Sequence, residues 1–228
     1  MVTKNIGRED DSAKVLHLLN GESMLHIFNK SHFLKGETLI PFNEAMCYGK
    51  TSADIFSPLF NKTRSRVHHV TVDEYKERTL KPLEPLFLKN FNQLELWFDF
   101  DMFCQINLLT VLGWLDQEHH KCSIKLHLID DQFKPIEEYS LTSEGYYLMY
   151  KQVLVDRKMP STIELSPLLK GVEWYLSYLK KDSELMEYIL LNIDTSENEL
   201  LLGLLNEFKH YGLGNTQYLE IIRELRRK

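Results

Sequence analysis

The chain has 228 residues, of which 43% are hydrophobic, 11% aromatic and 26% charged. This composition is ordinary for a folded globular protein and excludes an intrinsically disordered chain. The 27 Lys and Arg residues and 33 Asp and Glu residues give a net charge of −6, which provides no general attraction to nucleic acid or anionic membrane. No stretch approaches 18 uninterrupted apolar residues, and acidic residues stand where a signal peptide needs an apolar segment. The three cysteines are few and odd in number, so reduced thiols and a cytoplasmic location are predicted.

The first eighty residues predict short helices and strands. Asp11 or Ser12 is a candidate cap for a first helix, which Asn20-Gly21 would end. Apolar runs predict strands over residues 24–28, 37–42 and 67–71. Helical spacing predicts helices over residues 52–61, with Pro58 as a point of kinking, and over residues 72–80, which Thr71 leads into.

The clearest unit lies in the middle of the chain. Residues 94–98 predict an apolar strand, residues 101–114 a helix that is apolar almost all round, and residues 122–129 a second strand. Strand, helix and strand in this order indicate a βαβ crossover, and hence a parallel sheet covered by helices.

The pattern changes to helices after about residue 140. Helices are predicted near residues 143–156, 166–180, 183–192, 197–211 and 216–227. The predicted fold class is therefore α/β, with a parallel or mixed sheet and flanking helices, followed by an all-helical C-terminal part. The chain is divided into an α/β domain over residues 1–140 and a helical region over residues 141–228.

The first candidate site follows the strand over residues 94–98. Asp99 and Asp101 stand where a parallel strand passes into its helix, the edge of the sheet at which ligands collect. Gln105 lies one turn after Asp101 on the same helical face. Two carboxylates at this spacing suit a hydrated Mg²⁺ or a general base. The alternative is that they only cap the helix, and of the two Asp99 is the expected cap and Asp101 the expected ligand contact.

A second group of candidates, Asn43 and Glu44, follows the strand over residues 37–42. If this strand neighbours the strand over residues 94–98, Glu44 faces the same crevice as the aspartates, and three carboxylates would demand a cation or raise one pKa. The alternative is an ordinary solvated loop. Gly49-Lys50-Thr51 is similar to the end of a phosphate-binding P-loop, but that motif needs glycine at the position of Glu44.

Two further features have weaker functional interpretations. The doublets His68-His69 and His119-His120 are candidate metal ligands, although adjacent residues of an extended chain point to opposite faces. The last two helices have the proportions of a helix-turn-helix and a basic end that is a candidate nucleic-acid contact, against the alternative of a packed helical hairpin. The basic residues concerned are Arg223, Arg226 and Arg227.

Three short motifs in order resemble the bacterial domain of unknown function 1835 family over about residues 24–130. They are Leu25-His26-Ile27-Phe28-Asn29, residues 42–49 around Asn43-Glu44, and residues 96–109 around Asp99, Asp101 and Gln105. Members carry Gly-Asp after the first strand, where Asn29-Lys30-Ser31 stands here. The resemblance implies an α/β domain with a helical C-terminal segment in a bacterial cytosolic protein. It implies no activity, but it suggests that Glu44, Asp99, Asp101 and Gln105 belong to the family pattern.

The sequence therefore favours a ligand- or partner-binding regulatory module. The first alternative is a metal-assisted enzyme acting on a nucleotide or phosphorylated substrate, and the second is a DNA-binding regulator that uses the C-terminal helix pair. No complete arrangement of nucleophile, base and oxyanion donors is recognisable, so catalysis, cofactors, metal and partners stay open.

Overall fold

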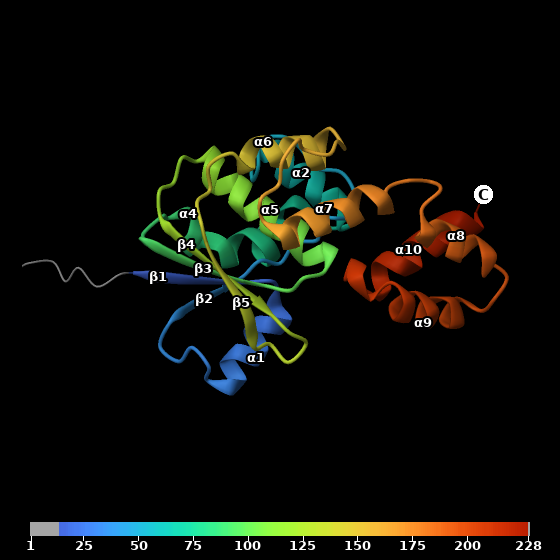
Figure 1. Ribbon diagram of the computed structural model, residues 1–228, viewed down its shortest axis with the longest axis horizontal. Coiled ribbons are helices and arrows are strands. Elements are labelled where there is room, and N and C mark those ends of the chain that lie inside the picture. The colour runs from blue at the N-terminus through green and yellow to red at the C-terminus, as the bar shows by residue number, and fades with distance from the viewer. Residues whose placement is uncertain (1–13, 228) are drawn as a thin grey trace, which may run out of the picture.

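The structure, a computed structural model, describes residues 14–227. Its centre is a five-stranded sheet in the order β2-β1-β3-β4-β5. The first four strands pair in parallel and β5 pairs antiparallel to β4, so the sheet is mixed (Figure 1). The predicted α/β fold with flanking helices is confirmed. The strands are β1 Val15–Leu19, β2 Thr38–Pro41, β3 Gln93–Phe98, β4 Ser123–Ile129 and β5 Pro135–Leu141.

The first two elements differ from the prediction. The run Val15–Leu19 forms the central strand β1, not a helix, and residues 24–28 lie in helix α1 (Glu22–Ser31), not in a strand. A strand covered on both faces has a continuous apolar run, which periodicity alone does not distinguish from a buried helix. Met24 and Phe28, four residues apart, are the buried residues of α1. The proposed caps Asp11 and Ser12 lie outside the described residues.

The βαβ prediction is confirmed. β3 leads into helix α5 (Met102–Gln117), which returns the chain to β4 beside β3. Almost every residue of α5 is buried, as expected for a helix that is apolar on most faces.

Between β2 and β3, a loop over residues 42–57 is followed by a largely helical segment over residues 58–87. Pro58 does not kink a helix but occupies the first turn of α2 (Pro58–Val67), which Ser57 caps. The predicted strand over residues 67–71 is wrong, because these residues end α2 and turn into α3 (Val72–Tyr75). Thr71 caps α3 as predicted, in a reciprocal capping box with Glu74. A π-helical turn (Lys76–Leu80), a 3₁₀ turn (Lys81–Leu83) and helix α4 (Glu84–Phe87) follow.

Beyond residue 141 the described chain is helical, as predicted. The edge strand β5 was missed, because most of its residues are exposed and its apolar pattern is weak. Gly212, with φ of 63°, ends the 3₁₀ turn before the last helix. The elements are α6 Tyr146–Tyr150, a π-helical turn Lys151–Val155, α7 Ser166–Tyr178, α8 Glu184–Leu191, α9 Glu197–Glu207, a 3₁₀ turn Lys209–Tyr211 and α10 Asn215–Arg226.

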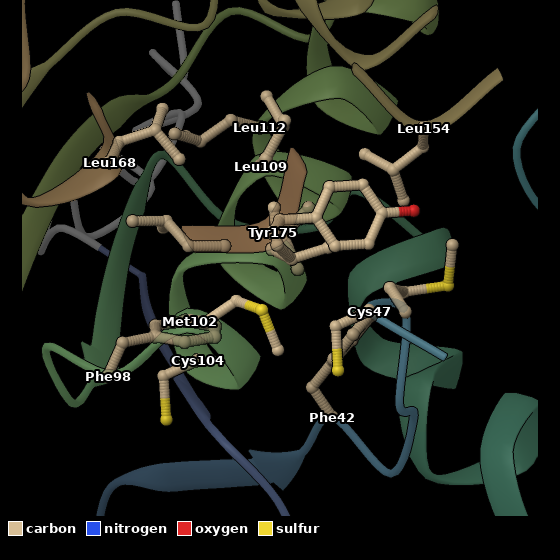
Figure 2. Packing of buried hydrophobic residues seen from close by; sticks show 14 of the residues in the cluster. Phe42, Cys47, Phe98, Met102, Cys104, Leu109, Leu112, Leu154, Leu168 and Tyr175 are labelled. Carbon is tan, nitrogen blue, oxygen red and sulfur yellow. The ribbon is translucent and has the colours of Figure 1, made fainter. Parts of the chain in front are cut away.

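The two faces of the sheet are covered unequally. Figure 1 shows α2, α4, α5, α6 and α7 on one side of the sheet and only α1 on the other, with α8, α9 and α10 projecting at one end. One continuous hydrophobic cluster joins the first face to the C-terminal helices. Figure 2 shows part of it, with Phe98 of β3 near Met102 of α5, and Leu168 and Tyr175 of α7 around it. Within residues 14–227, no helix is long and apolar enough to cross a membrane.

Candidate functional site

The carboxyl edge of the sheet contains a reversal of strand order. β1 lies between β2 and β3 in the sheet. After β1 the chain forms β2 on one side of it and then crosses to form β3 on the other side. In open α/β sheets this reversal leaves a crevice in which ligands bind. Three polar segments meet at this edge: Asn20-Gly21 after β1, Asn43-Glu44 after β2, and Asp99-Phe100-Asp101 after β3.

Glu44 is the most extensively bonded side chain at this edge. Its carboxylate is buried and accepts hydrogen bonds from Arg64 Nη2 at 2.7 Å, His68 Nε2 at 2.5 Å and Tyr75 Oη at 2.6 Å. Burial raises the pKa of Glu44, but the charge of Arg64 and the hydrogen bonds from His68 and Arg64 outweigh it and hold the pKa well below its usual range. Glu44 is therefore ionised and is not the solvated loop residue of the alternative interpretation.

Arg64 fixes the loop that contains Glu44. Its side chain is fully buried in α2, and its Nη1 donates to the carbonyl oxygens of Tyr48 at 2.7 Å and Lys50 at 3.0 Å. Its Nη2 also donates to the carbonyl of Ala45 at 2.9 Å. A planar guanidinium with several donors suits such a convergence of acceptors, which a lysine could not satisfy. The loop that resembles the end of a P-loop is thus folded around an arginine.

His68 is the partly exposed member of this cluster. Its ring stacks on Tyr75, with centroids 6.0 Å apart and an interplanar angle of 21°, and its side chain is 30% exposed. Because Nε2 is bonded to Glu44, the other ring nitrogen is the one available to a ligand. Burial and the neighbouring Glu44 raise the pKa of Tyr75, so its hydroxyl stays protonated and keeps donating.

A pocket of about 370 Å³ opens in front of His68. Its lining comes from residues 20–23, residues 42–45, His68 and Phe103. It therefore lies at the carboxyl ends of β1 and β2, against the first turn of α1. Of the sequence candidates, Asn43 and Glu44 line it, whereas Asp99, Asp101 and Gln105 do not.

The first turn of α1 faces this pocket without a side-chain cap. Gly21 is the N-cap residue, with φ of 96°, and a Cβ placed on it would meet no atom within 4 Å. The first backbone N–H groups of a helix have no partner within the helix and carry partial positive charge. The exposed Glu22 lies beside them, and Asn43 Nδ2 donates to its carboxylate at 3.3 Å.

Asn107 of α5 connects the segments that follow β1 and β2. Its Nδ2 donates to Asn20 Oδ1 and to the Glu44 carbonyl, each at 2.8 Å, and its Oδ1 accepts from the Met46 amide at 3.0 Å. Asn20 Nδ2 in turn donates to Cys104 Sγ. Asn107 is buried, and its hydrogen bonds hold the walls of the pocket together.

The prediction that Asp99 caps the helix after β3 is wrong. Asp101, not Asp99, is the N-cap of α5, and its Oδ1 accepts from the Cys104 amide at 2.7 Å. Burial is the main cause that raises the pKa of Asp101 to about 6, and the charge of Asp99 adds to it. The half-buried carboxylate of Asp99 accepts from the next amide, that of Phe100, at 2.5 Å. Asp99 and Asp101 are two positions apart in the chain, and the sequence does not define the start of a helix to within two residues.

Gln105 is buried instead of lining a cleft. Its Nε2 donates to the carbonyl oxygen of Asp99 at 2.7 Å, and Gly171 of α7 packs against its Cβ. Asp99, Asp101 and Gln105 therefore form one group at the β3–α5 corner, separate from the cluster around Glu44. Within residues 14–227, no group of three His, Cys, Asp or Glu side chains is placed to hold a metal ion.

Two of the three candidate arginines near the C-terminus make contacts within the chain. Arg223 forms two hydrogen bonds with the Glu197 carboxylate, at 3.1 and 2.8 Å, and Arg226 donates to the carbonyls of Ile193 and Thr195 at 3.0 and 2.6 Å. Both contacts fasten α10 to the chain around α9. Arg227 is exposed after the end of α10.

The cysteines are free, as expected. Cys47, which lies in the loop after β2, is fully buried, and burial raises its pKa far above its usual range. It is therefore a packed, unreactive thiol.

Comparison with known proteins identifies no match for the chain. No family model matches it, and no curated protein or solved structure matches it. What the pocket does must therefore be argued from its residues.

Sequence reasoning missed most of the Glu44 cluster. His68 was considered only within a metal-binding doublet, while its neighbour His69 lies 3.5 Å from Glu220 of α10. Arg64 and Tyr75 were not singled out, because a buried partner of a carboxylate carries no local sequence signal when it comes from another element.

Proposed function

We propose that this chain is a binding module for a small anion, such as a phosphorylated or carboxylated metabolite, held in the pocket between α1 and His68. The observation that carries the proposal is the convergence of two donor groups on one pocket at the strand-order reversal. These are the uncapped first turn of α1 and the imidazole of His68, whose Nδ1 donates when the ring is protonated. Helix N-termini at this position of α/β folds favour negative charge.

The buried charges behind His68 support this assignment. Glu44 is ionised and neutralised by Arg64, so it orients His68 through Nε2 without presenting a free carboxylate to the ligand. The open space around Gly21 allows an anion to approach the backbone closely. Glu22 is an exposed opposing charge on the rim, and Asn43 donates a hydrogen bond to its carboxylate.

The first test uses inorganic phosphate as the probe and thermal unfolding as the readout. A ligand that binds only the folded state stabilises it, by about 2.7 kcal/mol at 100 times Kd. Phosphate at pH 7 is expected to raise the Tm of the full chain. An unchanged Tm up to tens of millimolar phosphate, sulfate and a nucleoside monophosphate would contradict the proposal.

Two substitutions give opposite expected effects on phosphate affinity. Glu22→Gln removes a like charge from the rim and is expected to lower the Kd by about threefold, the size of a helix-terminus charge effect. His68→Gln removes the imidazole from the pocket wall and is expected to raise the Kd about tenfold. Isothermal titration calorimetry measures both.

Tyr75→Phe is the matched control for the His68 variant. It also removes one donor to Glu44, but Tyr75 is buried and does not line the pocket. Its phosphate affinity is expected to equal that of the wild type. Weaker binding in Glu22→Gln would instead indicate a cationic or polyhydroxylated ligand.

The two alternatives have less support. A metal-assisted enzyme would need free carboxylates, whereas Glu44 is bonded to Arg64 and Asp101 caps α5. A DNA-binding role would need free arginines, whereas Arg223 and Arg226 make contacts within the chain.

Membership of the domain of unknown function 1835 family stays a proposal, as do bacterial origin and a cytoplasmic location. β1 is Val15–Leu19, so the residues after the first strand of the described chain are Asn20-Gly21-Glu22. If the chain belongs to the family, Gly21 and Glu22 are the residues to compare with its Gly-Asp, and both line the pocket.

A further inference from the structure

The sheet face that carries α1 also carries a row of alternating carboxylates and imidazoles. His17 of β1 lies 3.7 Å from Glu95 of β3 through Nδ1 and 3.9 Å from Glu37 through Nε2. His127 of β4 lies 2.9 Å from Glu95 through Nε2 and 2.9 Å from Glu138 of β5 through Nδ1. Both imidazoles are almost fully buried, at 4% and 3% exposure, although α1 is the only helix among residues 14–227 that covers this face (Figure 1).

One hydrogen bond in this row depends on protonation. Trp97 Nε1 donates to His17 Nδ1 at 3.2 Å, so this nitrogen carries a lone pair and no proton. The same Nδ1 faces the Oε2 atom of Glu95. Once protonated, Nδ1 no longer accepts from the indole and becomes a donor suited to the carboxylate.

We propose that His17 is a proton-operated switch, in which a proton taken up from solvent on Nδ1 exchanges its partner from the Trp97 indole to the Glu95 carboxylate. No covalent bond other than the new N–H forms or breaks. The indole N–H is then left without its acceptor inside the protein, which is a costly state for a buried donor. The inference concerns a different face of the sheet and does not depend on the proposed anion site.

The surrounding charges set the range in which the switch acts. His17 faces the carboxylates of Glu95 and Glu37 and the second imidazole, His127, while Glu138 and Lys125 lie farther along the row. Burial lowers the pKa of His17, Glu95 and Glu37 raise it, and His127 lowers it, with a net shift below the ordinary 6.5. The switch therefore acts on mild acidification, below pH 6.5.

Trp97 transmits the change to α1. Its ring packs edge-on against Phe28 of α1, with centroids 5.3 Å apart, and against Phe33, at 5.6 Å. These aromatic contacts are the main attachment of α1 to the sheet, together with Leu19 and Met24. Movement of the indole therefore loosens α1 from this face.

The test follows the indole N–H of Trp97 by NMR in the full chain from pH 7.5 to pH 5. A Trp97→Phe variant assigns the signal. The signal is expected to titrate with a midpoint below pH 6.5, and hydrogen exchange of the α1 amides, corrected for intrinsic rates, is expected to rise with the same midpoint. The Trp114 signal serves as the internal reference.

Two variants separate His17 from His127, whose ring stacks on Trp97 at 4.0 Å. His17→Gln keeps an acceptor for the indole but takes up no proton, so the Trp97 signal is expected to stay constant. Glu95→Gln removes the second partner, and the wild-type midpoint is expected to move to lower pH. A signal that does not titrate in the wild type, or that titrates equally in His17→Gln, overturns the proposal. A titrating signal without a change in α1 exchange overturns the coupling to α1.

Discussion

Replacing Arg64 with methionine is expected to lower the free energy of unfolding by about 3–5 kcal/mol, the range found when one partner of a buried ion pair is removed. Methionine retains much of the side-chain volume, so the loss comes mainly from the charge. Glu44 would stay buried without the cation that keeps it ionised, and the carbonyls of Tyr48, Ala45 and Lys50 would lose their donor. Urea denaturation at pH 7 measures the loss.

The double variant Arg64→Met, Glu44→Gln shows whether the unpaired charge is the cause. It leaves no buried charge, so it is expected to recover a substantial part of the stability lost in Arg64→Met. If the double variant is as unstable as the sum of the single variants, the destabilisation comes from lost packing and carbonyl contacts instead. The ion pair with Glu44 would then not be the main source of loop stability.

Asp101→Asn is expected to stabilise the protein at neutral pH, by about 2–3 kcal/mol. The pKa of Asp101 rises from its ordinary value of 3.8 to about 6 in the folded protein, and each pKa unit corresponds to about 1.4 kcal/mol. The unfolded chain releases this proton first, so the carboxyl group lowers the stability progressively as pH rises from about 4 to about 6. Asparagine also accepts hydrogen bonds as an N-cap and has no charge to desolvate.

The pH profile distinguishes this effect from a general change in packing. The stability difference between Asp101→Asn and the wild type is expected to be largest above pH 6 and to disappear below about pH 4. Asp101→Ala, which also removes the cap of α5, is expected to be less stable than Asp101→Asn by about 1 kcal/mol at every pH. An Asp101→Asn protein less stable than the wild type at pH 7 would show that the carboxylate is better accommodated than its burial indicates.

Local patterns predicted the middle of the fold well. The unit of β3, α5 and β4 was predictable because α5 is long enough for its type to be clear, and a long helix between two apolar runs indicates a βαβ crossover. Thr71 as a cap of α3 was predictable for the same local reason, since the residues that make the cap are three positions apart. A helix was predicted where β1 lies and a strand where α1 lies, because a run of about five apolar residues is compatible with either type of element.

The sequence indicated two residues of the candidate pocket but not the side chains that surround Glu44. Glu44 and Asn43 were identified from the end of a strand, which requires only the order of elements. Arg64, His68 and Tyr75 come from α2, the turn after it and α3, and only the packed structure shows that they converge on Glu44. The same limit applies to Asp101, whose burial depends on Gly212, a residue of the distant C-terminal part.

The most direct test of the anion pocket is a titration of the ¹⁵N-labelled full chain with inorganic phosphate, followed by backbone amide signals. Saturable shifts are expected at Glu22, Ser23 and Met24 in the first turn of α1, together with the ring signals of His68. These shifts should keep their pattern but need less phosphate in Glu22→Gln. Absence of saturable shifts at these residues, or shifts confined to another part of the chain, would contradict an anion site at this pocket.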